Sequence, residues 1–125
     1  MFGVCDGHGH FGKEASGLVK QILPGQLETC SNYIEAFLNT DAALNKSVDT
    51  NLSGTTVVVV IFEGTKVICL NAGDSRAIKV SLNEQSYGQL YPEATALSED
   101  HKPELDVERD RILMTGGRIQ AFKDD

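Results

Sequence analysis

Positive charge is scarce in this sequence. Its 125 residues include 11 lysines and arginines against 18 aspartates and glutamates, which gives a formal net charge of −7. A protein that binds nucleic acid without regard to sequence needs clustered basic side chains to contact the phosphates. We therefore expect no nucleic-acid partner. The acidic residues are scattered along the chain, as on an ordinary solvated surface.

Long apolar runs and paired cysteines are also missing. The longest apolar run, Val57 to Phe62, is far shorter than the roughly 20 residues that span a bilayer. The first residues lack the basic stretch and apolar core of a secretory signal. The three cysteines are odd in number and have no CxxC spacing, so we expect reduced, packed thiols. These absences favour a cytoplasmic protein, with the nucleus as the alternative, and exclude a membrane partner.

The first half of the chain has helical periodicity. Apolar residues recur at helical spacing from Ala15 to Leu23, and Pro24-Gly25 is predicted to end that helix. A second helix is predicted to begin at Asn32, with Glu35 completing a capping box. One sector of this second helix is apolar and is expected to face the core: Ile34, Phe37, Leu38, Leu44 and Val48.

The remaining segments are typical of strands and turns. Residues 55–62 are β-branched and apolar throughout, which predicts a strand buried on both faces. The other expected elements are a strand at 2–5, a hairpin turn at 63–66, strands at 67–72 and 76–80 around a turn at 73–75, a hairpin end or surface loop over 81–93, and a short helix that starts at Pro103 and ends at Gly116-Gly117. Two helices followed by consecutive antiparallel strands predict an α+β fold in one domain.

Residues 5–10, Cys-Asp-Gly-His-Gly-His, raise the question of a metal site. If this segment is extended, Asp6, His8 and His10 face the same side and could converge on zinc or iron. If the glycines break the strand, a hard cation could instead bind Asp6 and the backbone carbonyl of Gly7. A glycine-rich turn with solvated histidines is the third possibility, and the hexapeptide alone does not choose among them.

Two later segments also carry polar groups. Asn71-Ala72-Gly73-Asp74-Ser75-Arg76 places an acid at a turn between strands, where Asp74 either bonds its own backbone or supplies a carboxylate at a sheet edge. In Leu97-Ser98-Glu99-Asp100-His101-Lys102-Pro103, Asp100 is expected to cap the following helix and His101 to be structural. Neither segment identifies a function by itself.

In order along the chain, however, these segments resemble the type 2C family of metal-dependent protein serine/threonine phosphatases. Four family motifs are matched between residues 2 and 119: FxVxDGHGG by residues 2–10, SGSTA by residues 53–57, NxGDSRA by residues 71–77, and LTxDHKP with its following charged helix and GG turn by residues 97–119. The resemblance covers nearly the whole chain.

The resemblance implies a fold, a reaction and a set of site residues. The fold would be part of an α/β/β/α four-layer sandwich with antiparallel sheets. The reaction would be hydrolysis of phosphoserine or phosphothreonine on a phosphoprotein by a water activated between two Mg²⁺ or Mn²⁺ ions. Asp6 would bridge the ions and Gly7 would give its carbonyl to one of them. His8 would be the general acid, and Asp74 would bind a third, weaker metal.

The sequence also departs from the family pattern. His10 replaces the usual glycine, and we expect its side chain to point to solvent. The family's strands before this motif, with a phosphate-binding arginine and an acidic pair, are absent, as are two later metal-binding aspartates. Residues 1–125 are therefore expected to form a single incomplete catalytic domain that binds metal poorly, hydrolyses little and self-associates through open sheet edges. The alternatives are a non-catalytic, phosphatase-like binding or regulatory module and, less favoured, a zinc or iron hydrolase built on Asp6, His8 and His10.

Overall fold

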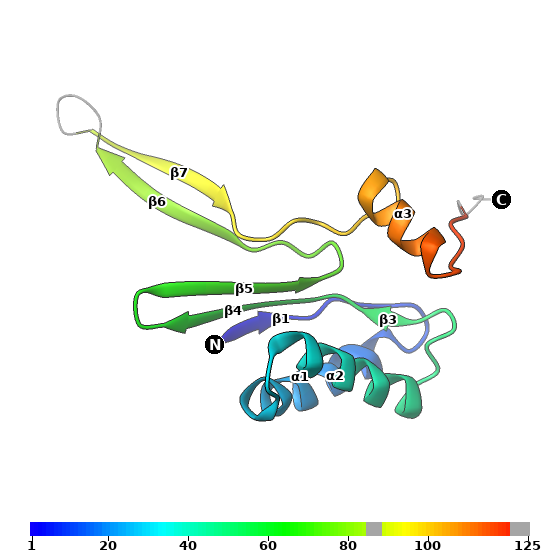
Figure 1. The fold of residues 1–125 in the computed structure, drawn as a ribbon. Coiled ribbons are helices and arrows are strands. Elements are labelled where there is room, and N and C mark those ends of the chain that lie inside the picture. The colour runs from blue at the N-terminus through cyan, green and yellow to red at the C-terminus, as the bar shows by residue number, and fades with distance from the viewer. Residues whose placement is uncertain (85–88, 121–125) are drawn as a thin grey trace.

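The protein has an α+β fold with antiparallel sheets, as predicted, in a computed structural model that describes residues 1–84 and 89–120 (Figure 1). The elements in chain order are β1 (Phe2–Val4), β2 (Gly7–His8), α1 (Gly12–Thr29), α2 (Tyr33–Ser47), β3 (Gly54–Thr55), β4 (Val57–Glu63), β5 (Lys66–Ala72), β6 (Ile78–Glu84), β7 (Leu90–Ala96) and α3 (Asp106–Met114). No helix in these described ranges is long and apolar enough to cross a membrane.

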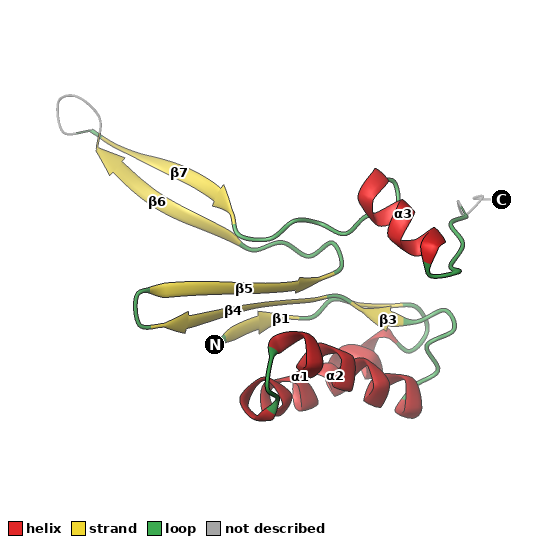
Figure 2. Cartoon of the chain, in the orientation of Figure 1, coloured by secondary structure: helices red, strands yellow, loops and turns green. Residues whose placement is uncertain are grey.

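A three-stranded sheet forms the centre of the molecule, and two helices pack on one of its faces. The strand order is β1-β4-β5, so β4 is the middle strand. Helices α1 and α2 lie side by side on the same face of this sheet (Figure 2). Alternate residues of β4 point toward the helices, and the core cluster consists of Ala15, Val19, Leu23, Leu44, Val57 and Val59.

The face of the sheet opposite the helices is partly exposed to solvent. Val57, Val58 and Val59 are buried, as expected for a strand covered on both sides, but Phe62 is 59% exposed. The prediction of burial on both faces over residues 55–62 is therefore wrong at the end of the strand, because α1 and α2 cover only one face. Phe2 and Val4 of β1 are exposed on the uncovered face.

Helix α1 continues through Pro24, so the predicted helix end at Pro24-Gly25 is wrong. A proline inside a helix costs about 3 kcal/mol, because it lacks an N–H donor and its ring meets the preceding turn. Leu23 is buried in the core, and Leu27, one turn further on, packs against the same cluster. Burial of these two side chains offsets the local cost and keeps the helix intact to Thr29.

Helix α2 begins at the predicted residue, but the predicted capping box forms only in part, because the Glu35 carboxylate accepts from the backbone N–H and the hydroxyl of Ser31, one residue before the N-cap. Asn32 is its N-cap, and the Asn32 side chain accepts a hydrogen bond from the backbone N–H of Glu35 at 2.9 Å. The predicted core face is only partly right, since Leu44 is buried whereas Ile34 and Leu38 are 74% and 64% exposed. The buried side of the helix also includes the smaller residues Ala36 and Thr40.

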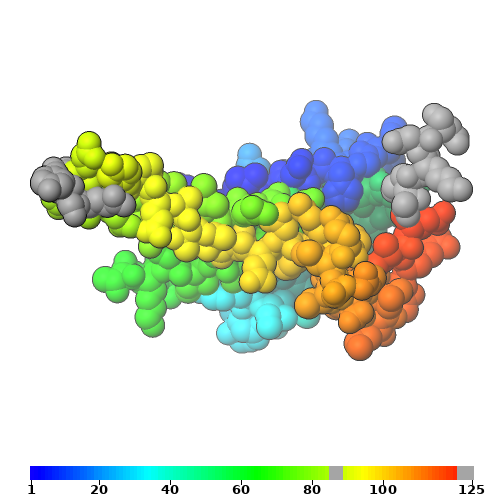
Figure 3. Space-filling view, turned by 90° about the horizontal axis from the view of Figure 1, so that it is seen from above, coloured from blue at the N-terminus to red at the C-terminus, as the bar shows by residue number. Residues whose placement is uncertain are grey.

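The β6–β7 hairpin and α3 lie at opposite ends of the molecule (Figure 3). Strand β6 runs from Ile78 to Glu84 instead of the expected 76–80, because it pairs with β7 along its whole length. The stretch 81–93 is thus the end of a hairpin, one of its two expected forms, and residues 85–88 lie outside the described ranges. Helix α3 starts at Asp106, three residues after the predicted start at Pro103, and ends before Gly116-Gly117 as predicted.

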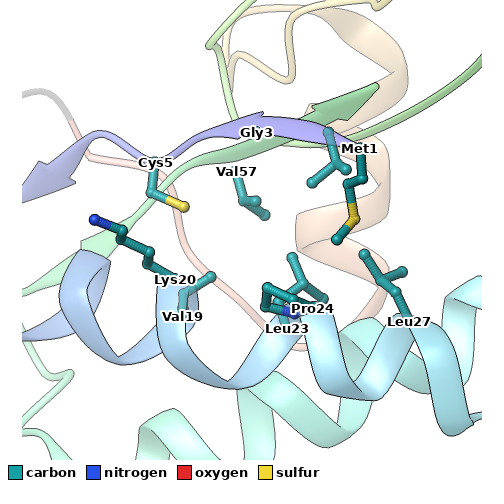
Figure 4. A pocket seen from close by; sticks show the side chains of 10 residues that line it. Met1, Gly3, Cys5, Val19, Lys20, Leu23, Pro24, Leu27 and Val57 are labelled. Carbon is teal, nitrogen blue, oxygen red and sulfur yellow. The ribbon is translucent and has the colours of Figure 1, made fainter. Parts of the chain in front are cut away.

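A small apolar cavity of about 190 Å³ separates β1 from α1 (Figure 4). Gly3 and Cys5 line it from the strand side, and Val19, Lys20 and Leu23 line it from the helix side. Burial raises the pKa of the Cys5 thiol, and the nearby Lys20 charge acts against this. All three cysteines are free thiols, in agreement with the sequence prediction.

Candidate functional site

The segment after β1 is turned by close contacts between glycines and the start of α1. A Cβ atom added to Gly7 would lie 1.9 Å from the backbone oxygen of Gly12. Gly9 has a φ of +77°, a conformation that other residues adopt at a cost. The backbone N–H of Phe11 donates to the Ser53 hydroxyl at 3.0 Å, which fixes the end of the turn. The glycine spacing therefore serves a tight strand-to-helix connection.

The two histidines of this segment lie in different surroundings. His8 is in β2, where its Nε2 atom would be 3.0 Å from a Cβ added to Gly54 on the paired strand β3. His10 follows the left-handed Gly9, and its ring packs edge-on against Phe11 with a centroid distance of 4.7 Å. Residues 1–84 and 89–120 contain no group of three His, Cys, Asp or Glu side chains placed to hold a metal. The Asp6–His8–His10 ligand set is therefore not formed, because Gly9 ends the extended conformation that it requires.

Asp6 is held in place by Thr56, which lies between β3 and β4. The Asp6 backbone N–H donates to the Thr56 hydroxyl oxygen at 3.1 Å, and the Thr56 backbone N–H donates to the Asp6 carbonyl at 2.9 Å. The Thr56 hydroxyl also lies 2.6 Å from the Ser75 hydroxyl. One buried side chain thus joins the segment of Asp6 to the turn that carries Asp74.

Residues 97–103, the third segment, are joined to the same turn by hydrogen bonds of both backbone and side-chain atoms. The His101 backbone N–H donates to the Gly73 carbonyl at 3.0 Å, and the Gly73 N–H donates to His101 Nδ1 at 3.4 Å. The Asn71 side chain bridges the carbonyls of Gly73 and Glu99 at 3.1 and 2.7 Å. His101 is thus structural here, as the sequence predicted. The three segments singled out from the sequence lie next to one another.

Asp100 forms an ion pair and does not cap a helix. Arg76 donates to both Asp100 carboxylate oxygens at 2.8 Å, and Lys102 Nζ lies 3.3 Å from one of them. The hydrogen bonds from Arg76 lower the pKa of Asp100 to about 2; burial acts against this and Lys102 adds to it. The predicted capping role is wrong, because α3 begins six residues later with Leu105 at its N-cap position and no side-chain cap.

The low pKa of Asp100 makes the fold sensitive to acid. Because the folded-state pKa lies below the ordinary value, the ion pair stabilises the fold above about pH 4 and this contribution is lost as the pH falls toward 2. We expect Asp100→Asn to flatten the fall of the melting temperature between pH 5 and pH 2.5, measured by circular dichroism. Asp110→Asn, at an exposed residue with no ion pair in the described ranges, is the control. Equal acid dependence of Asp100→Asn and the unaltered chain would contradict this role.

The donors in this region suit a hard divalent cation in kind. Asp6 and Asp74 are exposed carboxylates on segments that Thr56 connects. Mg²⁺ and Mn²⁺ prefer carboxylate, carbonyl and water oxygens, and Mg²⁺ is usually held by one or two carboxylates together with substrate phosphates and waters. Zinc and iron sites need imidazole or thiolate ligands that converge, and the described residues do not provide them.

The sequence reasoning missed one residue at the centre of this arrangement. Thr56 falls within the matched SGSTA segment, but no spacing pattern indicates that its hydroxyl contacts residues 50 positions before it and 19 after it. Predicting these contacts of Thr56 would require knowing which strands pair with one another.

The sequence of the chain is similar to those of known proteins of one family. A family model described as "Protein phosphatase 2C" matches residues 1–124. "Probable protein phosphatase 2C 12" of Oryza sativa subsp. japonica is 34% identical over 84% of this chain and 26% of its own length. "Probable protein phosphatase 2C 72" of Arabidopsis thaliana is 34% identical over 98% of this chain and 42% of its own length. A further probable protein phosphatase 2C, from Caenorhabditis elegans, is 35% identical over 96% of this chain and 34% of its own length.

The chain thus spans between about a quarter and less than half of these relatives. Since the family model matches almost every residue, and the segments that carry the match lie together in the structure, the chain belongs to the protein phosphatase 2C family.

Proposed function

We propose that these residues serve the metal-dependent hydrolysis of phosphoserine and phosphothreonine on phosphoproteins. The observation that supports the proposal is the connection through Thr56 of the Asp6 backbone to Ser75, which follows the exposed Asp74 in the same turn. Membership in the phosphatase family supports the reaction class. The proposal treats residues 1–125 as part of one catalytic domain, since the relatives are longer.

Each candidate residue has a distinct role in this proposal. The Asp6 carboxylate and the Gly7 carbonyl hold two Mg²⁺ or Mn²⁺ ions together with ligands from elsewhere, and Asp74 holds a third, weaker ion. The bound ions supply the Lewis acidity that activates water and neutralises phosphate charge. His8 donates a proton to the leaving oxygen of serine or threonine, a role suited to imidazole, which exchanges protons near neutral pH.

Phosphate release from a phosphothreonine peptide tests this function. We expect the protein encoded by the complete gene to hydrolyse the peptide with Mn²⁺ or Mg²⁺ and to stop when the metal is removed with a chelator. We expect the 125-residue chain alone to hydrolyse little, because residues 1–84 and 89–120 offer too few converging carboxylates to hold two ions. Hydrolysis by the complete protein that is unaffected by the chelator would contradict the proposal, and so would robust hydrolysis by the 125-residue chain.

We also propose that the isolated chain self-associates. Among the described strands, β1 and β5 are edges of the three-stranded sheet, and Phe2, Val4 and Phe62 are exposed beside them. Unpaired edges and an apolar face favour contact between copies. Sedimentation velocity that shows only monomer at all concentrations would contradict this.

The three free thiols favour a reducing compartment, the cytoplasm or the nucleus, which imaging of the tagged complete protein would test.

A further inference from the structure

Both the hydroxyl and the methyl group of Thr56 contact other residues. Its hydroxyl accepts from the Asp6 N–H at 3.1 Å and lies 2.6 Å from the Ser75 hydroxyl, so it joins the two segments directly. Its methyl group packs against Gly73, where an added Cβ would come within 2.8 Å of Thr56 Cγ2. Gly73 has a φ of +104°, so a larger residue would be strained at this point in any case.

Burial and the two flanking strands restrict the motion of Thr56. It is 8% exposed, and it follows β3, which pairs with β2, and precedes β4, the middle strand of the sheet. Its backbone N–H donates to the Asp6 carbonyl, so Thr56 contacts Asp6 through both its backbone and its side chain. A buried hydroxyl with two partners holds them at fixed separation, and losing it leaves a backbone N–H of Asp6 without its partner.

We propose that Thr56 is a positioning residue that sets the distance between the Asp6 carboxylate and the Asp74 turn. It contacts neither substrate nor metal and acts only through these two segments. This inference rests on the proposed function, because the geometry that Thr56 controls matters for activity only if Asp6 and Asp74 bind divalent ions.

The experiment compares three variants of the 125-residue chain by nuclear magnetic resonance. Thr56→Val keeps the shape and the methyl contact with Gly73 but removes the hydroxyl. Thr56→Ser restores the hydroxyl without the methyl group. Thr40→Val is the matched control, since Thr40 is also a buried threonine, 5% exposed, whose hydroxyl donates to the Ala36 carbonyl within α2. Amide hydrogen exchange is measured without metal, and Mn²⁺ is then added to follow broadening of the Asp6 and Asp74 amide signals.

In Thr56→Val, we expect the Asp6 amide to exchange about three- to tenfold faster, as the loss of one hydrogen bond predicts. We expect half-broadening of both signals to need several-fold more Mn²⁺ than in the unaltered chain. Thr56→Ser should restore the Asp6 exchange rate and the Mn²⁺ concentration for half-broadening to within about twofold of the unaltered chain. Thr40→Val should leave that Mn²⁺ concentration unchanged and should change the Asp6 exchange rate no more than the global exchange rate. Recovery with serine separates positioning from a general packing role.

The outcomes distinguish the two proposals. If Mn²⁺ broadens both signals in the unaltered chain and Thr56→Val responds identically, the role of Thr56 is overturned while the proposed function stands. If Mn²⁺ leaves the unaltered chain unchanged, hydrogen exchange still decides the role of Thr56, which is overturned if the Asp6 amide exchanges equally fast in Thr56→Val and in the unaltered chain. The proposed function is then decided separately, by the chelator sensitivity of hydrolysis in the complete protein. If Thr56→Val does not fold, Ser75→Ala takes its place, since it removes the other hydroxyl of the pair; we expect a smaller shift in the same direction, and no shift would overturn the inference.

Discussion

Asp6→Asn is expected to lower the phosphatase activity of the protein encoded by the complete gene by at least about 100-fold. Replacing a group that merely supports a metal ligand typically costs about 10- to 100-fold, so loss of a proposed ligand should cost at least as much. Asparagine keeps the size of the side chain and the Asp6 backbone bonds to Thr56, so the local structure should survive. The effect should therefore come from the lost negative charge.

Initial rates with a phosphothreonine peptide over a series of Mn²⁺ concentrations measure this effect. Asp41→Asn, at an exposed aspartate of α2, is the matched control and should retain full activity. Asp74→Asn should cost less than Asp6→Asn, because Asp74 is proposed to bind the weaker ion. Activity of Asp6→Asn within about threefold of the unaltered protein would exclude a role for Asp6 in metal binding.

Gly7→Ala is expected to destabilise the fold by about 3 kcal/mol or more. The added Cβ would lie 1.9 Å from the Gly12 oxygen and 2.5 Å from the Gly12 carbonyl carbon. Both are backbone atoms, so relief requires β2 or the start of α1 to move. Overpacking of this kind typically costs about 1–3 kcal/mol, and more where backbone must shift. Urea unfolding followed by circular dichroism gives the free energy of unfolding.

Gly17→Ala is the control for this substitution. Gly17 also lies in the first half of the chain, inside α1, but a Cβ there has no neighbour within 4 Å. Alanine is favoured over glycine within a helix by about 0.5–1 kcal/mol, so this variant should be more stable than the unaltered chain. If Gly7→Ala lowers the free energy of unfolding by less than about 1 kcal/mol, the close approach of Gly7 and Gly12 does not exist in solution.

Features that depend on neighbouring residues could be predicted from the sequence. The Asn32–Glu35 cap forms within one helical turn, and the return strand after Gly64 follows from the apolar pattern of residues 67–72. The continuation of α1 through Pro24 to Thr29 could not be predicted, because a local cost of about 3 kcal/mol is outweighed by burial of Leu23 and Leu27 against the core.

In the candidate site, too, local features could be predicted from the sequence and contacts between distant residues could not. The segments of Asp6, Asp74 and Asp100 are visible in the sequence as motifs. Their assembly is not, since it depends on the Thr56 hydroxyl and on the Arg76–Asp100 ion pair, whose partners are 24 residues apart. The extended Asp6–His8–His10 ligand set failed for a physical reason that a spacing rule does not include, the left-handed backbone at Gly9.

A titration of the 125-residue chain with Mn²⁺ and with Zn²⁺, followed by nuclear magnetic resonance, tests the oxygen-ligand site most directly. We expect Mn²⁺ to broaden the amide signals of Asp6 and Gly7 together, and the signal of Asp74 at higher concentrations, because Asp74 is proposed to bind the weaker ion. We expect His10→Ala to leave this response and any Zn²⁺ response unchanged, since the His10 ring packs on Phe11. Tight, stoichiometric Zn²⁺ binding that is lost in His10→Ala, with no response of Asp6 to Mn²⁺, would contradict the site described above.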